Sequence, residues 1–162
     1  MVETTDLSTT GTQLDAIHCL TIPLDNETVI LPNTAIAEVI GYTAPEAVSD
    51  APDWFLGHIN WRDKRVPLVS FESASGHDVA EPKKNSRIAI LNTLNGNAQL
   101  PYVAIMSQGI PSLALVNQET INAKDSASTR QAISAFVEHD GQEVIIPNLD
   151  ELEQRVLRLH LL

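Results

Sequence analysis

The sequence places a thiol directly after an imidazole, at His18 and Cys19, a pair of groups that can support nucleophilic catalysis. Neighbouring residues of an extended chain point to opposite faces, so these two side chains are not expected to share a cleft. A single cysteine also excludes an intrachain disulfide and a cysteine-rich zinc site. We therefore expect Cys19 to be a buried structural residue. A small cytoplasmic hydrolase that uses Cys19 is the alternative.

The other residue types that support catalysis or metal binding are scattered. His77 and Asp78, with Glu81 nearby, could hold a divalent ion, but a metal site needs more converging ligands, and a solvated loop is the expectation. The acidic residues of positions 1–61 are spread over several turns rather than paired, which gives no support to a glycosidase site. The glycine-rich phosphate-binding motifs, the H-E-x-x-H motif and the G-x-S-x-G motif are missing from the sequence. No catalytic, cofactor or metal site is therefore predicted.

The charge of the chain is strongly negative and unevenly distributed. The 162 residues include 21 acidic and 10 basic side chains, for a net charge of −11. A surface of this sign is poorly suited to nucleic acid or to anionic lipid. No lysine or arginine precedes Arg62, which Lys64 and Arg65 follow closely. Arg62 is expected to neutralise Glu38 or Asp53 or to orient a partner protein, and the two roles are compatible.

Two stretches bear on localisation. Residues 1–13 are rich in threonine, serine and acidic residues and lack the basic and apolar regions of a signal peptide, which predicts a flexible arm and a cytoplasmic protein. The uncharged stretch 88–118 is interrupted too often by asparagine, glutamine, glycine and proline to cross a membrane directly. It is expected to be part of the core.

Turn residues separate short β-segments along most of the chain. Three hairpins are predicted, and their turns are Asp25-Asn26, Asn95-Gly96 and Asp140-Gly141. Residues 35–40 are expected to be extended because they are rich in β-branched side chains and lie between prolines. Asn148, three residues before Glu151, and apolar residues at helical spacing predict an amphipathic helix over 149–161. Many short strands with few helices indicate a mainly β fold of small barrels or a sandwich.

The strand expected over residues 65–71 contains Pro67, which lacks a backbone donor. Such a strand should lie at a sheet edge or carry a bulge. An exposed edge is a place where another protein can add a strand, and a weak homodimer is a further expectation.

Motifs over residues 15–72 resemble those of the CheW-like domain of chemotaxis adaptors. Leu31-Pro32 precedes a V-x-E-V-like segment at 36–40, a G-x-x-x-x-R motif follows at 57–62, and a V-P-L-V-S-F strand follows at 66–71. The chain departs from the family pattern at Asp63, where a glycine is usual, and at Ser70, where an acid is usual. The second half matches more loosely, with residues 107–110 near the place of a V-D-E-V-like segment.

This resemblance implies two small SH3-like β-barrel lobes with a C-terminal α-helix, in a single domain over residues 14–162. The first lobe would comprise residues 14–72 and a C-terminal return, the second residues 87–147, and the closing helix residues 149–161. The Trp61-Arg62 pair and the ending at 69–72 look more like the auxiliary adaptors of type IV pilus (twitching) chemosensory systems.

The resemblance further implies a non-catalytic adaptor without a cofactor, which joins the cytoplasmic tip of a chemoreceptor to a histidine kinase of the CheA type. Residues carried over to partner binding are Ile36, Glu38, Val39, Gly57, Arg62 and Pro67. Ile36 and Val39 would lie on a hydrophobic groove, with Gly57 and Arg62 at the turn that supports it. A β-barrel that binds a small ligand is a third reading, which would require a sizeable apolar pocket between the lobes.

Overall fold

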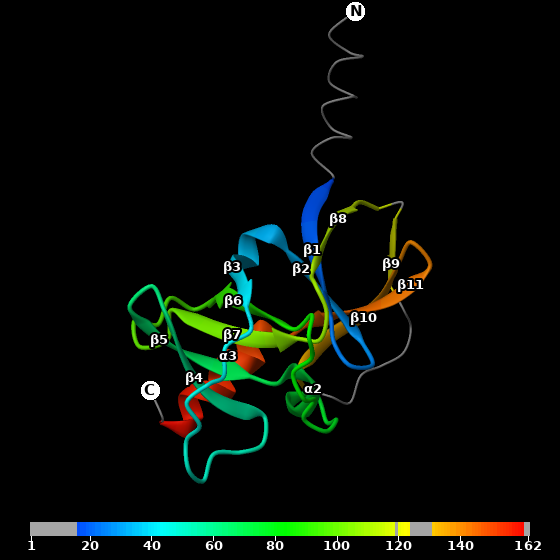
Figure 1. The fold of residues 1–162 in the computed structure, drawn as a ribbon. Helices are drawn as coiled ribbons and strands as arrows, with labels where there is room; N and C mark the ends of the chain where they lie inside the picture. The colour runs from blue at the N-terminus through cyan, green and yellow to red at the C-terminus, as the bar shows by residue number, and fades with distance from the viewer. Residues whose placement is uncertain (1–15, 119, 124–130, 161–162) are drawn as a thin grey trace, which may run out of the picture.

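A computed structural model describes residues 16–118, 120–123 and 131–160 (Figure 1). The predicted arm at residues 1–13 lies outside the described residues. The strands are β1 (Ile17–Pro23), β2 (Thr28–Pro32), β3 (Ile36–Gly41), β4 (Phe55–Trp61), β5 (Lys64–Val69), β6 (Arg87–Asn92), β7 (Tyr102–Ser107), β8 (Ser112–Val116), β9 (Ile121–Ala123), β10 (Ile133–His139) and β11 (Gln142–Pro147). The helical elements are η1 (Asn33–Ala35), α2 (Phe71–Ala74) and α3 (Leu149–Leu159).

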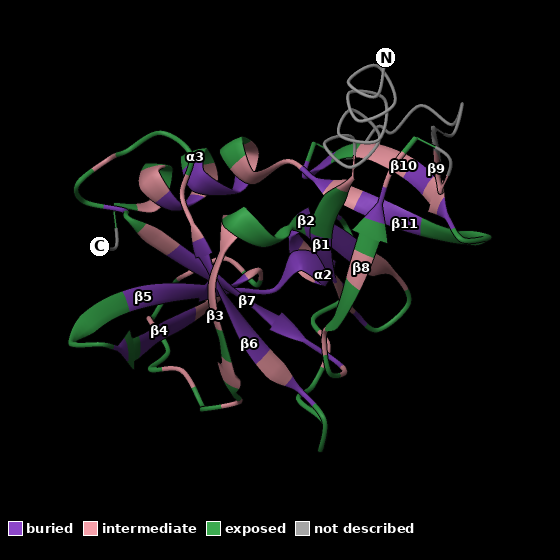
Figure 2. Cartoon of the chain, turned by 90° about the horizontal axis from the view of Figure 1, so that it is seen from above, coloured by how far each residue is buried: buried purple, intermediate pink, exposed green. Residues whose placement is uncertain are grey.

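The strands form two sheets that lie side by side as two lobes (Figures 1 and 2). One sheet has the order β8-β1-β2-β11-β10-β9, and the other has the order β3-β6-β7-β5-β4. The predicted class, mainly β with two small lobes and a C-terminal helix, is confirmed. The pairing groups the strands differently from the predicted lobes, because β1 and β2 join β8–β11 instead of β3–β5. A hairpin turn determines only the pairing of the two strands that it connects. The sheet to which the β1–β2 hairpin belongs is determined by the long-range pairing of β2 with β11.

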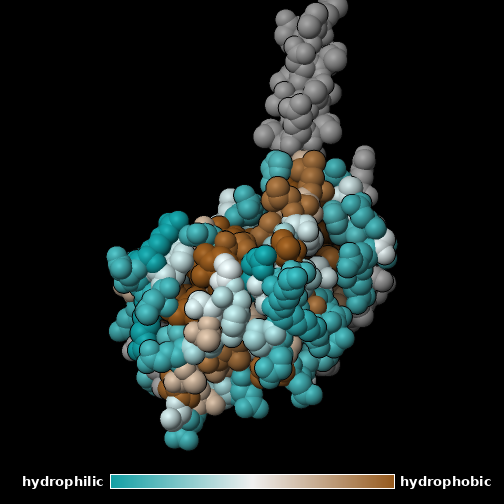
Figure 3. Space-filling view, in the orientation of Figure 1, coloured by the Kyte–Doolittle hydropathy of each residue, from teal (hydrophilic) through white to brown (hydrophobic). Residues whose placement is uncertain are grey.

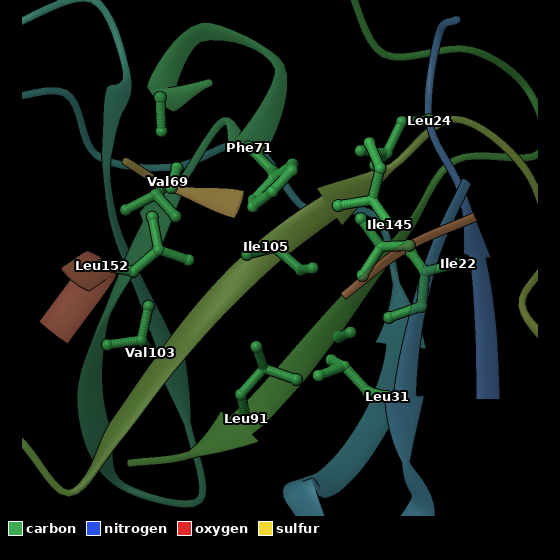
Figure 4. Packing of buried hydrophobic residues seen from close by; sticks show 14 of the residues in the cluster. Ile22, Leu24, Leu31, Val69, Phe71, Leu91, Val103, Ile105, Ile145 and Leu152 are labelled. Atoms are coloured by element: carbon green, nitrogen blue, oxygen red, sulfur yellow. The ribbon is translucent and has the colours of Figure 1, made fainter. Parts of the chain in front are cut away.

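Three clusters of buried apolar side chains form the core. The largest lies between the two sheets and the helices, where Ile22 and Leu31 face Leu91 and Ile105, and Phe71 and Leu152 close the cluster (Figure 4). A second cluster fills the five-stranded lobe around Leu68, and a third fills the six-stranded lobe around Cys19. Burial of a large aliphatic side chain contributes about 1.5–3 kcal/mol, so the interface between the lobes is a main source of stability.

Two of the predicted hairpins are confirmed by the strand register. β1 pairs with β2 antiparallel across the turn at residues 24–27, and β10 pairs with β11 so that His139 lies opposite Gln142. The intervening Asp140 and Gly141 have φ of 50° and 79°, which a two-residue hairpin turn of the primed type requires. The predicted extended segment at 35–40 is observed as η1 followed by β3.

The tight turn predicted at Asn95-Gly96 is wrong. β6 and β7 do pair, but the register ends at Asn92 opposite Tyr102, so a loop of residues 93–101 connects them. The loop is held from outside, because the buried carboxylate of Glu153 on α3 accepts hydrogen bonds from the N–H groups of Leu94 (2.8 Å) and Asn95 (3.2 Å). A tertiary contact with the last helix therefore replaces the local turn.

The helix predicted at 149–161 is confirmed as α3, which ends at Leu159. The side chain of Asn148 accepts a hydrogen bond from the N–H of Glu151, which caps the first turn. His160 adopts a left-handed conformation that closes the helix, and residue 161 lies outside the described residues. Among the described residues, no helix is long and apolar enough to cross a membrane.

Candidate functional site

At the centre of the candidate site, two neighbouring side chains of the β4–β5 turn donate hydrogen bonds to the same carboxylate oxygen of Glu38. Trp61 Nε1 donates to Glu38 Oε1 at 2.9 Å, and Arg62 Nη2 donates to the same oxygen at 3.0 Å. The Arg62 guanidinium also lies 4.8 Å from the centroid of the Trp61 ring. Arg62 is 67 % exposed at its side chain, so it retains donors that face solvent. The expected neutralisation of Glu38 by Arg62 is confirmed.

The backbone of the turn positions this arginine. Trp61 pairs with Lys64, so only Arg62 and Asp63 connect β4 to β5. Their φ values are 47° and 61°, both in the left-handed region. Aspartate tolerates this conformation better than most residues because its short side chain can bond locally. Asp63 can therefore adopt the backbone conformation of this turn, at a position where the family that the motifs resemble usually has glycine.

An irregularity in β3 separates the predicted groove residues into two groups. The register with β6 shifts between Ile36 and Glu38. Ile36 and Val39 lie opposite Leu91 and Ala89, which belong to the cluster between the lobes, whereas Glu38 lies opposite Ile90, inside the five-stranded lobe. The structure thus places Ile36 and Val39 on one face of β3 and the Glu38–Arg62 pair on the other.

Gly57 and Pro67 lie away from this group. Gly57 is inside β4, not at the turn with Arg62 as expected, and its α-carbon faces the carbonyl of Glu46, from which an added Cβ would be only 2.3 Å away. Pro67 lies on β5, which is an inner strand and not the predicted edge strand. Pro67 lies opposite His58 on β4, but the backbone N–H and C=O of His58 bond to Glu46 instead of to Pro67. The backbone nitrogen of Pro67 therefore faces β7. The pairing of β5 with β7 begins only at Leu68, so the sheet does not need a donor at Pro67. The alternative prediction, a bulge on the strand of Pro67, is also wrong, because the register irregularity lies on β4, between Phe55 and Gly57.

Exposed apolar side chains on β8 and at the start of β1 were not predicted. Leu113 is 79 % exposed, and Leu115 and Ile17 are about half exposed. Figure 3 shows hydrophobic surface at the end of the molecule where these two strands lie. The available signal was the Leu-Ala-Leu alternation inside an uncharged stretch, which indicates a strand whose leucines share one face. Leu113 and Leu115 lie on one face of β8 and form the β8 patch, whereas Ile17 lies opposite Val116, on the other face of the sheet.

The thiol has no catalytic surroundings. Cys19 is buried on β1, and burial raises the pKa of its thiol, which disfavours the reactive thiolate. His18 is exposed on the opposite face of the same strand, as the alternation of strand residues predicts. These observations argue against the hydrolase that uses Cys19.

The groups considered for metal and ligand binding do not converge either. His77 contacts Glu27 at 3.3 Å, and within the described part of the chain no set of three potential ligands is arranged to hold a metal ion. The space between the lobes beside α3, lined by Leu91, Val103 and Leu152, has a volume of only about 10 Å³. That volume is roughly one water molecule, so this part of the interface has no room for a small-molecule ligand.

Glu72 is a buried carboxylate beside a polar cavity of about 180 Å³, where its Oε2 accepts a hydrogen bond from the N–H of Asp25 at 3.2 Å. Burial raises the pKa of Glu72, although hydrogen bonds from its own helix turn and from Asp25 oppose the rise. The folded state therefore binds more protons than the unfolded state between the unfolded and the raised pKa. Stability contributed by this group is present at low pH and is lost as the pH rises through that window.

Replacement of Glu72 with glutamine should remove this loss of stability at high pH, because glutamine does not ionise. The glutamine side-chain oxygen can still accept the hydrogen bond from the N–H of Asp25. We expect Glu72→Gln to unfold at a higher temperature than the wild type near pH 8, with the difference shrinking towards pH 4. Thermal denaturation across this range measures the effect. Glu81→Gln, at an exposed carboxylate, is the matched control and should show no such trend. A lower melting temperature of Glu72→Gln at pH 8 would show that the charge is stabilising.

Comparisons with known proteins place these features in a family. The sequence model of one family, the CheW-like domain, matches residues 18–156. No curated protein matches the sequence. Among solved structures, the crystal structure of the scaffolding protein TtCheW from Thermoanaerobacter tengcongensis superposes with a TM-score of 0.69 at 18 % identity, over 82 % of this chain and 84 % of that one. The similarity to that structure concerns the fold.

Proposed function

The chain belongs to the CheW-like family, the scaffolding adaptors of chemosensory signalling, and we propose that it joins the cytoplasmic tip of a chemoreceptor to a CheA-type histidine kinase. It acts by contact and not by catalysis. Its net charge of −11 disfavours nucleic acid as a partner. Both proposed partners present their binding regions in the cytoplasm, which is where we place the protein.

The observation that carries this proposal is the connection of the β4–β5 turn to β3. Trp61 and Arg62 hold Glu38 from one side, and Ile36 and Val39 lie on the other side of the same strand. Val39 is 36 % exposed, so its apolar side chain is available to a partner. A fixed, partly apolar strand surface suits a helical tip or the edge of another barrel. Arg62 is thus a positioning residue for the surface that includes Val39, and Gly57 and Pro67 support the same lobe.

Weak individual contacts suffice for such an adaptor. Transient signalling interfaces often bury less than about 1,200 Å². Receptors and kinases that assemble in arrays multiply weak contacts into a stable assembly, because each linked contact raises the effective concentration of the next.

Replacement of Arg62 tests the role of the Glu38–Trp61–Arg62 cluster. We expect Arg62→Ala to weaken binding to the kinase regulatory domain or the receptor tip by about fivefold to tenfold, because the Glu38 carboxylate on β3 loses one of its two side-chain donors. Calorimetry or a pull-down with folded protein measures the effect. Lys83→Ala is the control, since Lys83 is an exposed cation whose Nζ lies 2.9 Å from Asp25. Equal binding by wild type and Arg62→Ala would refute the role of Arg62.

The finer proposal of a type IV pilus system is supported by the Trp61-Arg62 pair and the ending at residues 69–72. In that case, deletion of the gene should impair twitching and leave swimming intact. The opposite phenotype would assign the protein to flagellar chemotaxis.

A further inference from the structure

We propose that Asn95 is a site of spontaneous deamidation, and that the reaction releases the loop of residues 93–101 from α3. Asparagine is a thermolabile side chain, and it reacts fastest when glycine follows it, because glycine has no Cβ to hinder the approach of its own backbone nitrogen. Of the asparagines in this chain, only Asn95 precedes a glycine. The inference goes beyond the proposed function and requires neither receptor nor kinase.

The surroundings of the loop leave the reacting groups accessible. Asn95 and Gly96 are both exposed. Among the described residues, the N–H of Gly96 donates to no other group, so no hydrogen bond holds its nitrogen in place. Gly96 has a φ of 64°, and nothing lies within 4 Å of the position that a Cβ would occupy. The nitrogen of Gly96 therefore has room to approach the side chain that precedes it.

The reaction requires only water. The backbone nitrogen of Gly96 attacks Cγ of Asn95 and closes a succinimide ring, while the Cγ–Nδ2 bond breaks and ammonia leaves with the proton of that nitrogen. Water then opens the ring. Opening at Cγ gives aspartate, and opening at the backbone carbonyl gives isoaspartate, in which the main chain runs through Cγ. In both products a carboxylate has replaced the amide.

In the closed loop, contacts with α3 hold Asn95 away from this reaction. Its Nδ2 donates to Asp150 Oδ1 at 2.6 Å, and its backbone N–H donates to Glu153 Oε1 at 3.2 Å. The side chain must leave Asp150 before its Cγ can meet the nitrogen of Gly96. Local opening of the loop therefore precedes the reaction, and the hydrogen bond to Asp150 slows it.

The product cannot restore these contacts. The new carboxylate has no hydrogen to donate, and it would face the carboxylate of Asp150. Within the described part of the chain, neither Asp150 nor Glu153 forms an ion pair, since Arg155 and Arg158 both pair with Glu151. The added negative charge is therefore not compensated, and like charges at this distance repel. Deamidation thus converts a transient opening of the loop into a permanent one.

Peptide mass spectrometry of the full chain, sampled during incubation at mildly alkaline pH, tests the site. Asn97 is an internal control, because it lies in the same loop before an alanine. We expect Asn95 to deamidate about tenfold faster than Asn97. Asp150→Ala should speed the reaction of Asn95 by about threefold to tenfold, because the amide loses its acceptor. Asp78→Ala, at an exposed carboxylate before β6, should leave the rate unchanged.

Hydrogen exchange tests the release of the loop. Asn95→Asp introduces the charge of the product, and we expect the amides of residues 94 and 95 to exchange about tenfold faster than in the wild type, because they no longer donate to Glu153. Asn97→Asp is the matched control. It adds the same charge in the same loop, and its side-chain oxygen can still accept the hydrogen bond from the N–H of Gln99.

Three outcomes would overturn the proposal. Asn95 could react no faster than Asn97, or Asp150→Ala could leave the rate of Asn95 unchanged. The amides of residues 94 and 95 could also exchange as slowly in Asn95→Asp as in Asn97→Asp, which would show that the loop stays on α3 after the charge is introduced.

Discussion

Gly57→Ala should destabilise the folded protein by about 3 kcal/mol, a large fraction of the stability of a domain of this size. Gly57 has a φ of 138°, which only glycine adopts readily, and an added Cβ would lie 2.3 Å from the carbonyl oxygen of Glu46. The opposing backbone cannot move away cheaply, because Glu46 and His58 exchange hydrogen bonds of 2.8 and 3.0 Å. The substitution forces either these bonds or the β4 backbone to give way.

Urea denaturation of Gly57→Ala beside Gly41→Ala measures this effect. Gly41 ends β3 with an ordinary φ, and nothing lies within 4 Å of its added Cβ, so its substitution should change the unfolding free energy by less than about 1 kcal/mol. Equal midpoints for the two variants would show that the contact with Glu46 does not constrain β4.

Val39→Asp should weaken partner binding by tenfold or more, because a charge placed in an apolar contact must lose water without gaining a partner. Val39 is 36 % exposed on an outer strand, so the fold tolerates the aspartate. Titration with the kinase regulatory domain and with a receptor-tip fragment measures the affinity and shows which partner uses β3.

Val79→Asp provides the control for this substitution. Val79 is 38 % exposed, carries the same side chain and lies in the polar connection before β6, away from the proposed surface. If the two variants bind both partners equally well, β3 is not the docking surface, whatever the role of Arg62.

Local features of the fold could be predicted from the sequence because they depend on neighbouring residues. Asp140 and Gly141 tolerate a positive φ, and Asn148 caps a helix whose apolar residues recur at a spacing that buries one face. Elements fixed by distant contacts could not be predicted in this way. The loop at 93–101 is held by Glu153, more than fifty residues later, and no local pattern reports that contact.

The candidate site shows the same division. The pairing of Arg62 with Glu38 was one of two expectations for the first cation of an acidic half, and the structure confirms it. The separation of Val39 from Glu38 would follow from simple strand alternation, but the placement of Ile36 on the same face as Val39 depends on the register shift in β3. This register shift lies in the long-range pairing of β3 with β6, which the sequence alone does not specify.

Co-sedimentation of the kinase with receptor-containing membranes, with and without this chain, tests the central claim most directly. The account predicts that the kinase sediments with the receptor only when the chain is present, and that Val39→Asp reduces the sedimented kinase while Val79→Asp does not. If the kinase stays in the supernatant at every concentration of the folded protein, or if the kinase sediments equally well without the protein, the protein does not couple the kinase to the receptor.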